Sequence, residues 1–225
     1  MYDGKICLFI APHPDDETLG CGGTILKLKA KGASVHWLIV TTTKDVSGFP
    51  QRRVPVRAKE IKSVQKAYGF DSVHHCSLPA AALDTLDKGK LVDAIGAVIK
   101  CVKPDCIYIP YRNDVHSDHA AVFDASVSAT KTFRAPFVKA IYAYETLSET
   151  DFCLRPDDPG FRPNLYEDIS EYLDQKISIM SLYDGEMGVF PFPRSDECLR
   201  ALATLRGAQS NCLAAEAFMI LKEIR

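Results

Sequence analysis

The sequence predicts an α/β fold: one mostly parallel sheet flanked by helices, with helical additions and a lid towards the C-terminus. Short apolar runs of strand length alternate with segments of helical periodicity between residues 6 and 144, as in parallel sheets joined by right-handed crossovers. Two clusters of histidine and acidic residues each follow one of these runs and precede a helical segment. Open α/β sheets bind ligands at such turns, outside the carboxyl ends of the strands.

Length and composition fit a single domain over residues 1–225. Hydrophobic residues make up 47% of the chain and charged residues 25%, an ordinary globular mixture. The net charge of -2 offers no basic field for nucleic acid, and no apolar run approaches the ~20 residues of a membrane span. The first residues lack the ordered regions of a signal peptide. The eight cysteines form no Cys-x-x-Cys pair and most lie in apolar runs, which indicates reduced thiols in a cytoplasmic protein.

The elements of the first 144 residues follow from apolar periodicity. The predicted strands cover residues 6–10, 34–41, 72–76, 105–110 and 139–144, and the predicted helices cover 18–31, 57–68, 91–102 and about 120–133. Gly32, Gly69 and Pro104 end three of these helices. The polar stretch 42–55, broken by glycine and proline, is predicted as a loop at the carboxyl end of the sheet.

Beyond residue 144 the pattern is less regular. Residues 146–164 are rich in Pro, Asp and Gly and are predicted as an excursion, or lid, over the site. Asp168 is predicted to open one helix, and Ser195 a second helix, with a loop over residues 183–193 between them. The last segment favours a strand after Glu216.

The first cluster, His13-Pro14-Asp15-Asp16-Glu17, lies between a predicted strand and a predicted helix. A neutral imidazole and a carboxylate, here His13 and Asp16, are common ligands of divalent metals. Asp15 lies between them and is free to act as a general base. Taken alone, the same residues also fit helix capping, because Asp is a frequent N-cap and Glu in a first turn complements the helix dipole.

The second cluster, Asn113-Asp114-Val115-His116-Ser117-Asp118-His119, decides between these interpretations. It follows the strand predicted at 105–110, so both clusters lie at the same end of one sheet. His119 can complete a His–carboxylate–His set with His13 and Asp16, which leaves coordination positions open, as a catalytic site requires. Two independent caps made of ligand-type residues at one sheet end are improbable.

Two residues of the second cluster remain outside this ligand set. His116 is available to contact an oxyanion or to carry a proton, and Asp118 can orient it through a ring nitrogen.

Two other classes of function share part of this pattern. Two histidines and one carboxylate also describe the facial triad of non-haem iron oxygenases, although the neighbouring Asp15 suits hydrolysis better. A nucleotide-binding module is the second alternative, since residues 20–25 are similar to a dinucleotide fingerprint. They fail G-x-G-x-x-G because position 25 is Ile, and the acidic pair beside them would repel a pyrophosphate.

These motifs resemble those of the PIG-L/LmbE-like zinc-dependent de-N-acetylases over nearly the whole chain. Residues 11–17 with Gly20-Cys21-Gly22-Gly23 resemble the first family motif, and residues 116–119 resemble the second. The weaker matches are Arg57 with Glu60, Leu78-Pro79, Pro163-Asn164 with Asp168, Lys176, Arg206-Gly207 and residues 215–218. One departure is Ala80, where many relatives carry an acidic residue after the proline; Asp84 is the candidate to replace it.

The resemblance implies a Rossmann-like sheet and one zinc held by His13, Asp16 and His119, with Fe²⁺ as an alternative metal. It implies Asp15 as general base and His116 as the group facing the oxyanion. Relatives remove acetyl groups from N-acetylglucosamine attached to inositol, malate, lipid or another sugar, often as trimers or hexamers. The expected function is therefore hydrolysis of an N-acetyl group from a 2-acetamido sugar. A metal-dependent amidase acting on another acylated small molecule is the alternative.

The loops around the clusters are polar enough to bind the hydroxyl groups of a sugar. The residues expected to bind substrate are Arg57, Asp84, Asn113 and Tyr144.

Overall fold

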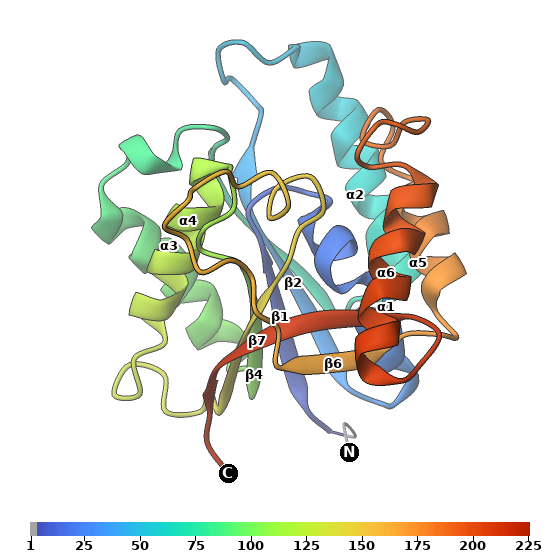
Figure 1. Ribbon diagram of the computed structural model, residues 1–225. Coiled ribbons are helices and arrows are strands. Elements are labelled where there is room, and N and C mark those ends of the chain that lie inside the picture. Colours follow the sequence, from blue (N-terminus) through green and yellow to red (C-terminus); the bar gives the residue numbers. More distant parts are fainter. Residues whose placement is uncertain (1–3) are drawn as a thin grey trace.

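The computed structural model describes residues 4–225 as a seven-stranded sheet between two groups of helices (Figure 1). The strands are β1 (Ile6–Ala11), β2 (Ser34–Thr42), β3 (Ser72–Pro79), β4 (Cys106–Pro110), β5 (Ala140–Tyr144), β6 (Leu165–Asp168) and β7 (Ala215–Glu223). The helices are α1 (Asp16–Ala30), α2 (Val54–Tyr68), α3 (Lys88–Val102), α4 (Ser117–Ala129), α5 (Leu173–Met180) and α6 (Asp196–Ser210), with short 3-10 turns η1 (Gln51–Arg53) and η2 (Leu83–Thr85).

The strand order confirms the predicted fold class. It runs β3-β2-β1-β4-β5-β7-β6, and the first five strands in this order pair in parallel. Strand β7 pairs antiparallel with β5 and β6, so the parallel sheet carries an antiparallel edge. The chain leaves β1 in one direction along the sheet and continues from β4 in the other. The crevice between β1 and β4 is therefore the switch point at which such sheets bind ligands.

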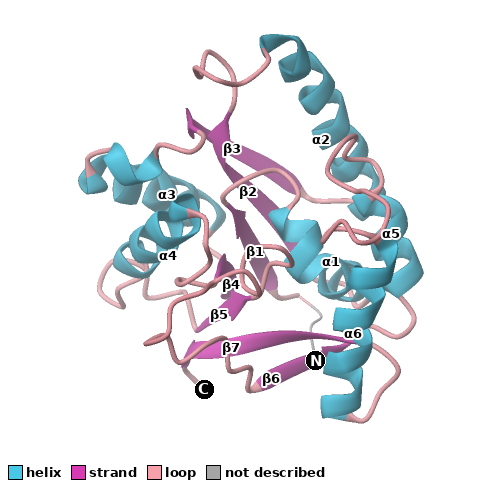
Figure 2. Cartoon of the chain, turned by 45° about the horizontal axis from the view of Figure 1, so that its top comes forward, coloured by secondary structure: helices cyan, strands magenta, loops and turns pink. Residues whose placement is uncertain are grey.

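Two hydrophobic cores cover the two faces of the sheet. Figure 2 shows the helices that lie on either side of the sheet. One core joins the sheet to α1, α2 and α5, and the other joins it to α3 and α4. Strands β1 and β4 are buried along both faces, which is why their sequences are continuous apolar runs without polar alternation.

The predicted elements up to residue 144 are all present, with shifted ends. Helix α2 begins at Val54, before the predicted residue 57, and Pro55 is accommodated in its first turn. Helix α4 spans Ser117–Ala129, so it starts and ends earlier than predicted. The strand favoured after Glu216 is confirmed as β7, which begins at Ala215.

The prediction that Asp168 opens a helix is wrong. Asp168 is the last residue of β6, where it pairs with Ala215 of β7, and the helix begins only at Leu173. The side chain of Asp168 accepts hydrogen bonds from the backbone N–H and the hydroxyl of Ser170, as an Asp does in a turn. Strand β6 is an edge strand that exists through pairing with β7, and such distant pairing leaves no periodic signal in four residues.

A buried ion pair from the C-terminal half of the chain holds α1. The Glu216 carboxylate accepts the backbone N–H groups of Gly23 and Thr24, at 2.9 and 2.8 Å. Lys176 Nζ donates to the same carboxylate and to the carbonyl of Leu19, at 2.7 and 2.8 Å. A side chain at Gly22 would meet Lys176, because an added Cβ would lie 2.8 Å from its Cγ. The helix that carries the first acidic cluster is therefore tied to α5 and β7.

None of the helices in the part of the chain that the structure describes combines the length and the apolar character needed to cross a membrane.

Candidate metal centre and the cavity around it

The two predicted clusters meet at the carboxyl ends of β1 and β4. His13 lies in the turn between β1 and α1, and Asp16 begins α1. His119 lies in the first turn of α4, after β4. Because β1 and β4 are hydrogen-bonded neighbours, the turns that follow them are adjacent in space.

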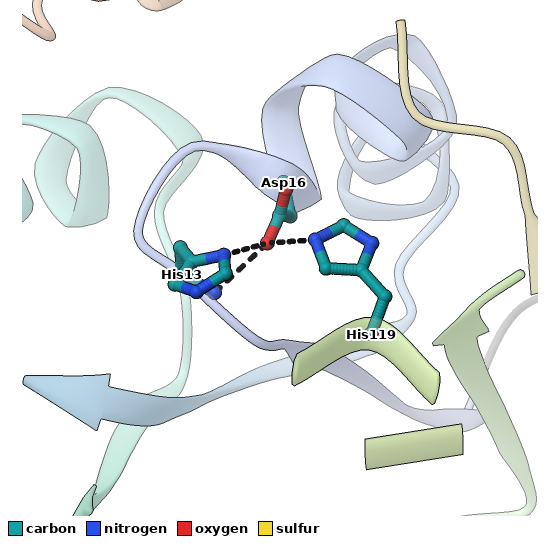
Figure 3. A group of neighbouring side chains, drawn as sticks. All are labelled: His13, Asp16 and His119. Atoms are coloured by element: carbon teal, nitrogen blue, oxygen red, sulfur yellow. Dashed lines mark hydrogen bonds and ion pairs between the residues drawn. The ribbon is translucent and has the colours of Figure 1, made fainter. Parts of the chain in front are cut away.

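His13, Asp16 and His119 form a compact group that could hold a metal ion (Figure 3). Oδ2 of Asp16 lies between the two rings, 3.3 Å from Nδ1 of His13 and 3.4 Å from Nε2 of His119. The same oxygen accepts the backbone N–H of His13 at 2.8 Å, which fixes the carboxylate. Asp16 and His119 are fully buried.

The ring nitrogens that face away from this centre are held by two other carboxylates. Nε2 of His13 lies 3.0 Å from Asp118, and Nδ1 of His119 lies 2.7 Å from Asp114. Such carboxylate partners fix the tautomer and orientation of metal-binding histidines and raise their basicity. This role of Asp114 was not predicted, although the residue lies within the second cluster. Its position five residues before His119 could have indicated that its carboxylate contacts that ring.

The donor set fits a divalent metal. Nε2 of His119 is buried and forms no hydrogen bond within residues 4–225; its contact there is the long ion pair with Oδ2 of Asp16, at 3.4 Å, so a metal ion held by both groups would satisfy it. Burial by itself would lower the pKa of His13, but its hydrogen bonds to Asp118 and Asp16 raise that pKa to about 9. The centre therefore favours positive charge.

A second possible ligand group shares His13 but adds His116 and Asp118. It fits a metal less well, because the Asp118 carboxylate already accepts hydrogen bonds from three donors. Besides His13, it accepts the backbone N–H groups of Ala81 and Leu83, at 2.7 and 3.0 Å.

These contacts correct the role predicted for Asp118. Its carboxylate does not orient His116, because it is directed at His13 and at the backbone after β3. Instead, the backbone N–H of Asp118 donates to Nδ1 of His116 at 3.1 Å. Burial, and next the neighbouring His13, lower the pKa of His116, so its ring is neutral near pH 7. With Nδ1 accepting, the ring proton lies on Nε2, which is free to donate.

Asp15 adopts a strained backbone conformation beside this centre. Its φ of 141° is uncommon for a residue with a side chain, and such strain gathers at functional sites. The backbone N–H of Asp15 donates to the carboxylate of Glu17 at 3.1 Å, and Glu17 in turn accepts the hydroxyl of Tyr183 at 2.7 Å. Burial and the adjacent Asp16 raise the pKa of Asp15, while Arg194 opposes that shift.

Arg194 contacts Asp15 and was missed by sequence reasoning. Its Nη1 lies 2.8 Å from Asp15 Oδ2 and 3.2 Å from Glu186, and its Nη2 lies 3.3 Å from Glu149. Arg194 follows an irregular loop without periodicity, and its partners are 45 or more residues away or lie in the same loop. No local signal in the sequence marks such a residue.

The centre opens into a cavity of about 790 Å³. His13, Asp15 and His116 line its inner end, together with Glu149 and Arg194. The loop predicted over residues 183–193 contributes Asp184, Gly185 and Glu186, whereas the predicted lid over 146–164 contributes Glu149.

Of the four residues expected to bind substrate, the structure brings Arg57 into the cavity. Its guanidinium forms ion pairs with Glu186 and, at 3.3 Å, with Glu60. Asp84 is exposed in η2 and does not line the cavity. Asn113 also lies outside the lining, where its amide donates to Asp158 at 3.1 Å.

The expectation that Tyr144 recognises a sugar hydroxyl is wrong. The ring is fully buried, and its hydroxyl donates to the carbonyl of Ile10 at 2.9 Å. Tyr144 ends β5, and its side chain packs beneath Gly20 of α1, inside the core.

Comparison with known proteins gives a consistent result. Residues 8–130 match the model of one protein family, PIG-L, described as GlcNAc-PI de-N-acetylase. The chain is 27% identical over 187 residues to a probable N-acetyl-alpha-D-glucosaminyl L-malate deacetylase 2 of Bacillus cereus, covering 80% of this chain and 82% of that protein. It is 26% identical over 238 residues to the diacetylchitobiose deacetylase of Thermococcus kodakarensis, with coverage of 95% and 82%.

Among solved structures, the fold is similar to that of the conserved protein TT1542 from Thermus thermophilus. The TM-score is 0.78 at 25% identity, and the match covers 97% of this chain and 96% of the other.

Proposed function

The chain belongs to the PIG-L family of GlcNAc-PI de-N-acetylases, and from this we propose that it removes the N-acetyl group from a 2-acetamido sugar. The products are acetate and the free amine of an N-acetylglucosamine-type conjugate. Relatives named as deacetylases of glucosaminyl malate and of diacetylchitobiose support this substrate class.

One observation carries the proposal. A His–Asp–His group, in which Asp16 and His119 are buried and Nε2 of His119 lacks a hydrogen bond among the described residues, lies beside a strained aspartate, at the inner end of a cavity large enough for a sugar conjugate. We propose zinc as the metal, because two histidines and one carboxylate are a common ligand set of catalytic zinc. When bound, the metal would polarise the acetyl carbonyl and activate water.

The remaining steps belong to side chains of this protein. Asp15 accepts a proton from the attacking water and returns it to the amine, which leaves poorly without that proton. His116, neutral and protonated on Nε2, donates a hydrogen bond to the oxyanion that develops at the carbonyl oxygen of the acetyl group. Arg194 holds the carboxylate of Asp15 in place through its ion pair.

The reaction is tested by measuring amine and acetate release from N-acetylglucosamine, its α- and β-glycosides and its nucleotide-linked form. The metal-loaded protein is expected to release one acetate for each amine. Protein that releases acetate from none of these but cleaves a peptide amide or a phosphate ester would overturn the proposal.

The metal ligands are tested by measuring the metal content of wild-type protein and of His119→Ala. Wild type is expected to hold one zinc per chain and His119→Ala far less. Equal contents in the two proteins would remove His119 from the ligand set.

We also propose a cytoplasmic location, because none of the eight cysteines forms a disulfide, as is usual where thiols are kept reduced. An assembly of three or six chains stays a prediction, which sedimentation of the purified protein would test.

A further inference from the structure

The cavity extends beyond the candidate metal centre, between α2 and the edge strand β3. From α2 it is lined at positions 54, 57, 58, 61, 62 and 65, a spacing of three to four residues that marks one face of a helix. From β3 it is lined by Val73, His75 and Ser77, which alternate along one face of the strand. We call the space between these two faces the α2–β3 cleft.

This cleft is an unusual feature of a layered α/β fold, because a helix face opposite a sheet normally packs on it. Here Val54 and Ile61 are only half-buried, and Ala58 between them is exposed. Figure 2 shows α2 extending along β3 to the edge of the sheet. The lining face of α2 therefore presents an apolar strip, formed by Val54, Ala58 and Ile61, beside polar side chains at positions 57, 62 and 65.

The cleft is long enough for more than one sugar ring. Positions 54 and 65 are eleven residues apart, which is about 16 Å along a helix axis. The whole cavity, about 790 Å³, lies in the upper part of the range of about 300–1,000 Å³ for small-molecule sites. An acetamido sugar with its acetyl group at the metal centre would occupy the inner end and leave the cleft for its glycosidic substituent.

The charges of the cavity favour an uncharged substituent. Each of its three arginines is paired with carboxylates of the protein. Arg53 lies 2.7 Å from Asp184, Arg57 is paired with Glu186, and Arg194 lies 2.8 Å from Asp15. The fourth cation of the lining, Lys62, is exposed to solvent, where an ion pair with an anionic aglycone contributes little.

We propose that the α2–β3 cleft binds an uncharged aglycone with an apolar face, joined to the acetamido sugar that is hydrolysed at the metal centre. This inference rests on the proposed function, since it assigns the second half of the same substrate. The apolar wall consists of Phe49, Pro50, Val54, Ala58, Ile61 and Val73.

The test compares kcat/KM for three compounds: N-acetylglucosamine, its phenyl glycoside, and the glycoside of malate, each glycoside as both anomers. The kcat/KM of the phenyl glycoside is expected to exceed that of each other compound by about tenfold or more. A factor of this size is what the burial of one face of an aromatic ring contributes. A malate glycoside that equals the phenyl glycoside, or a phenyl glycoside no better than the free sugar, would overturn the assignment.

The position of the aglycone is tested with Ala58→Phe, which places a ring in the cleft from an exposed helical site. The preference for the phenyl glycoside over the free sugar is expected to fall towards one. The matched control is Ala67→Phe, an exposed alanine of α2 that does not line the cavity, and it should retain the full preference. Equal preferences in the two variants would place the aglycone outside the cleft.

A binding measurement separates this inference from the proposed function. Calorimetric titration of Asp15→Asn protein with the phenyl glycoside needs no turnover, and Ala58→Phe in that background is expected to weaken binding about tenfold or more. Acetate release from the free sugar without any phenyl preference contradicts the cleft assignment alone. Phenyl-glycoside binding without acetate release from any acetamido sugar contradicts the proposed reaction.

Discussion

At the scale of single residues, the candidate centre depends on carboxylates that do not themselves face the metal position. Asp118 holds His13, and Asp114 holds His119. Asp114 is in turn fixed by the hydroxyl of Thr150, which donates to its second oxygen at 2.6 Å. Each imidazole therefore has one nitrogen committed to a carboxylate and the other directed at Asp16, so the rings are oriented before any metal binds.

Replacing Asp114 is expected to weaken the metal site without removing a ligand. In Asp114→Ala, Nδ1 of His119 loses its acceptor, and outer carboxylates of this kind are typically worth about 10–100-fold in metal affinity. Competition with a chromogenic chelator measures the dissociation constant. The control is Asp124→Ala, which removes a surface carboxylate of α4 paired with Arg112 and should leave the affinity unchanged. Identical affinities in both variants would deny Asp114 this role.

Asp15→Asn is expected to keep the metal and lose most turnover. The amide is nearly isosteric with the carboxylate but cannot accept a proton at neutral pH, and loss of a general acid–base typically costs about 10²–10⁴-fold. Steady-state amine release, with metal content measured on the same sample, checks this. Turnover close to that of wild type would assign the base to another residue.

At the scale of elements, α1 is the helix on which the site depends. Asp16 lies in its first turn, and Asp15 precedes it with a φ of 141°. The middle of the helix is bound by the Lys176–Glu216 pair, which takes up backbone N–H and C=O groups of residues 19–24. Both side chains are about 5% exposed, so removal of either one would leave the other as an unpaired buried charge. The pair fixes where α1 lies on the sheet and thereby where its first turn points.

Removing one member of this pair is expected to be costly. Glu216→Ala leaves the Lys176 ammonium buried without its partner, and breaking a buried pair in this way typically costs about 3–5 kcal/mol. Urea unfolding followed by circular dichroism measures the change. Glu223→Ala, on the same strand with an exposed partner at Arg225, should change stability by less than about 0.5 kcal/mol. A similar small change for Glu216→Ala would mean that the pair adds little to the fold.

At the scale of the whole molecule, the site joins segments far apart in the chain. The proposed ligands come from the turns after β1 and β4, whereas Arg194 comes from the region before α6. The cavity is completed by α2 and β3 at the edge of the sheet. A metal bound by His13, Asp16 and His119 would link turns about one hundred residues apart.

Metal removal is therefore expected to lower the thermal stability of the whole protein. A ligand that binds only the folded state, at a thousandfold excess over its dissociation constant, contributes about 4 kcal/mol. In a chain of this size that is on the order of 10 °C in Tm. Calorimetric scans with and without chelator measure the shift, and His119→Ala should show little response to chelator. A wild-type Tm unaffected by chelator would argue against a tightly bound metal.

Much of the fold and the inner site could be predicted because the signals are local. Buried parallel strands are continuous apolar runs, and helices repeat their apolar residues every three to four positions. His13, Asp16 and His119 could be grouped because the carboxyl ends of neighbouring parallel strands meet at one edge, so that two short motifs suffice to place them.

Contacts between distant segments became visible only in three dimensions. Tyr144 looked like a polar residue at a strand end, but the packing of β5 under α1 buries it. Asp168 looked like a helix start, but pairing of β6 with β7 makes it a strand end. Arg194 gave no signal, because an irregular loop brings it to Asp15 from 179 residues away. The periodic elements and the proposed ligands therefore follow from local sequence. Which residues of distant segments contact one another depends on how those segments pack, and local spacing does not encode this.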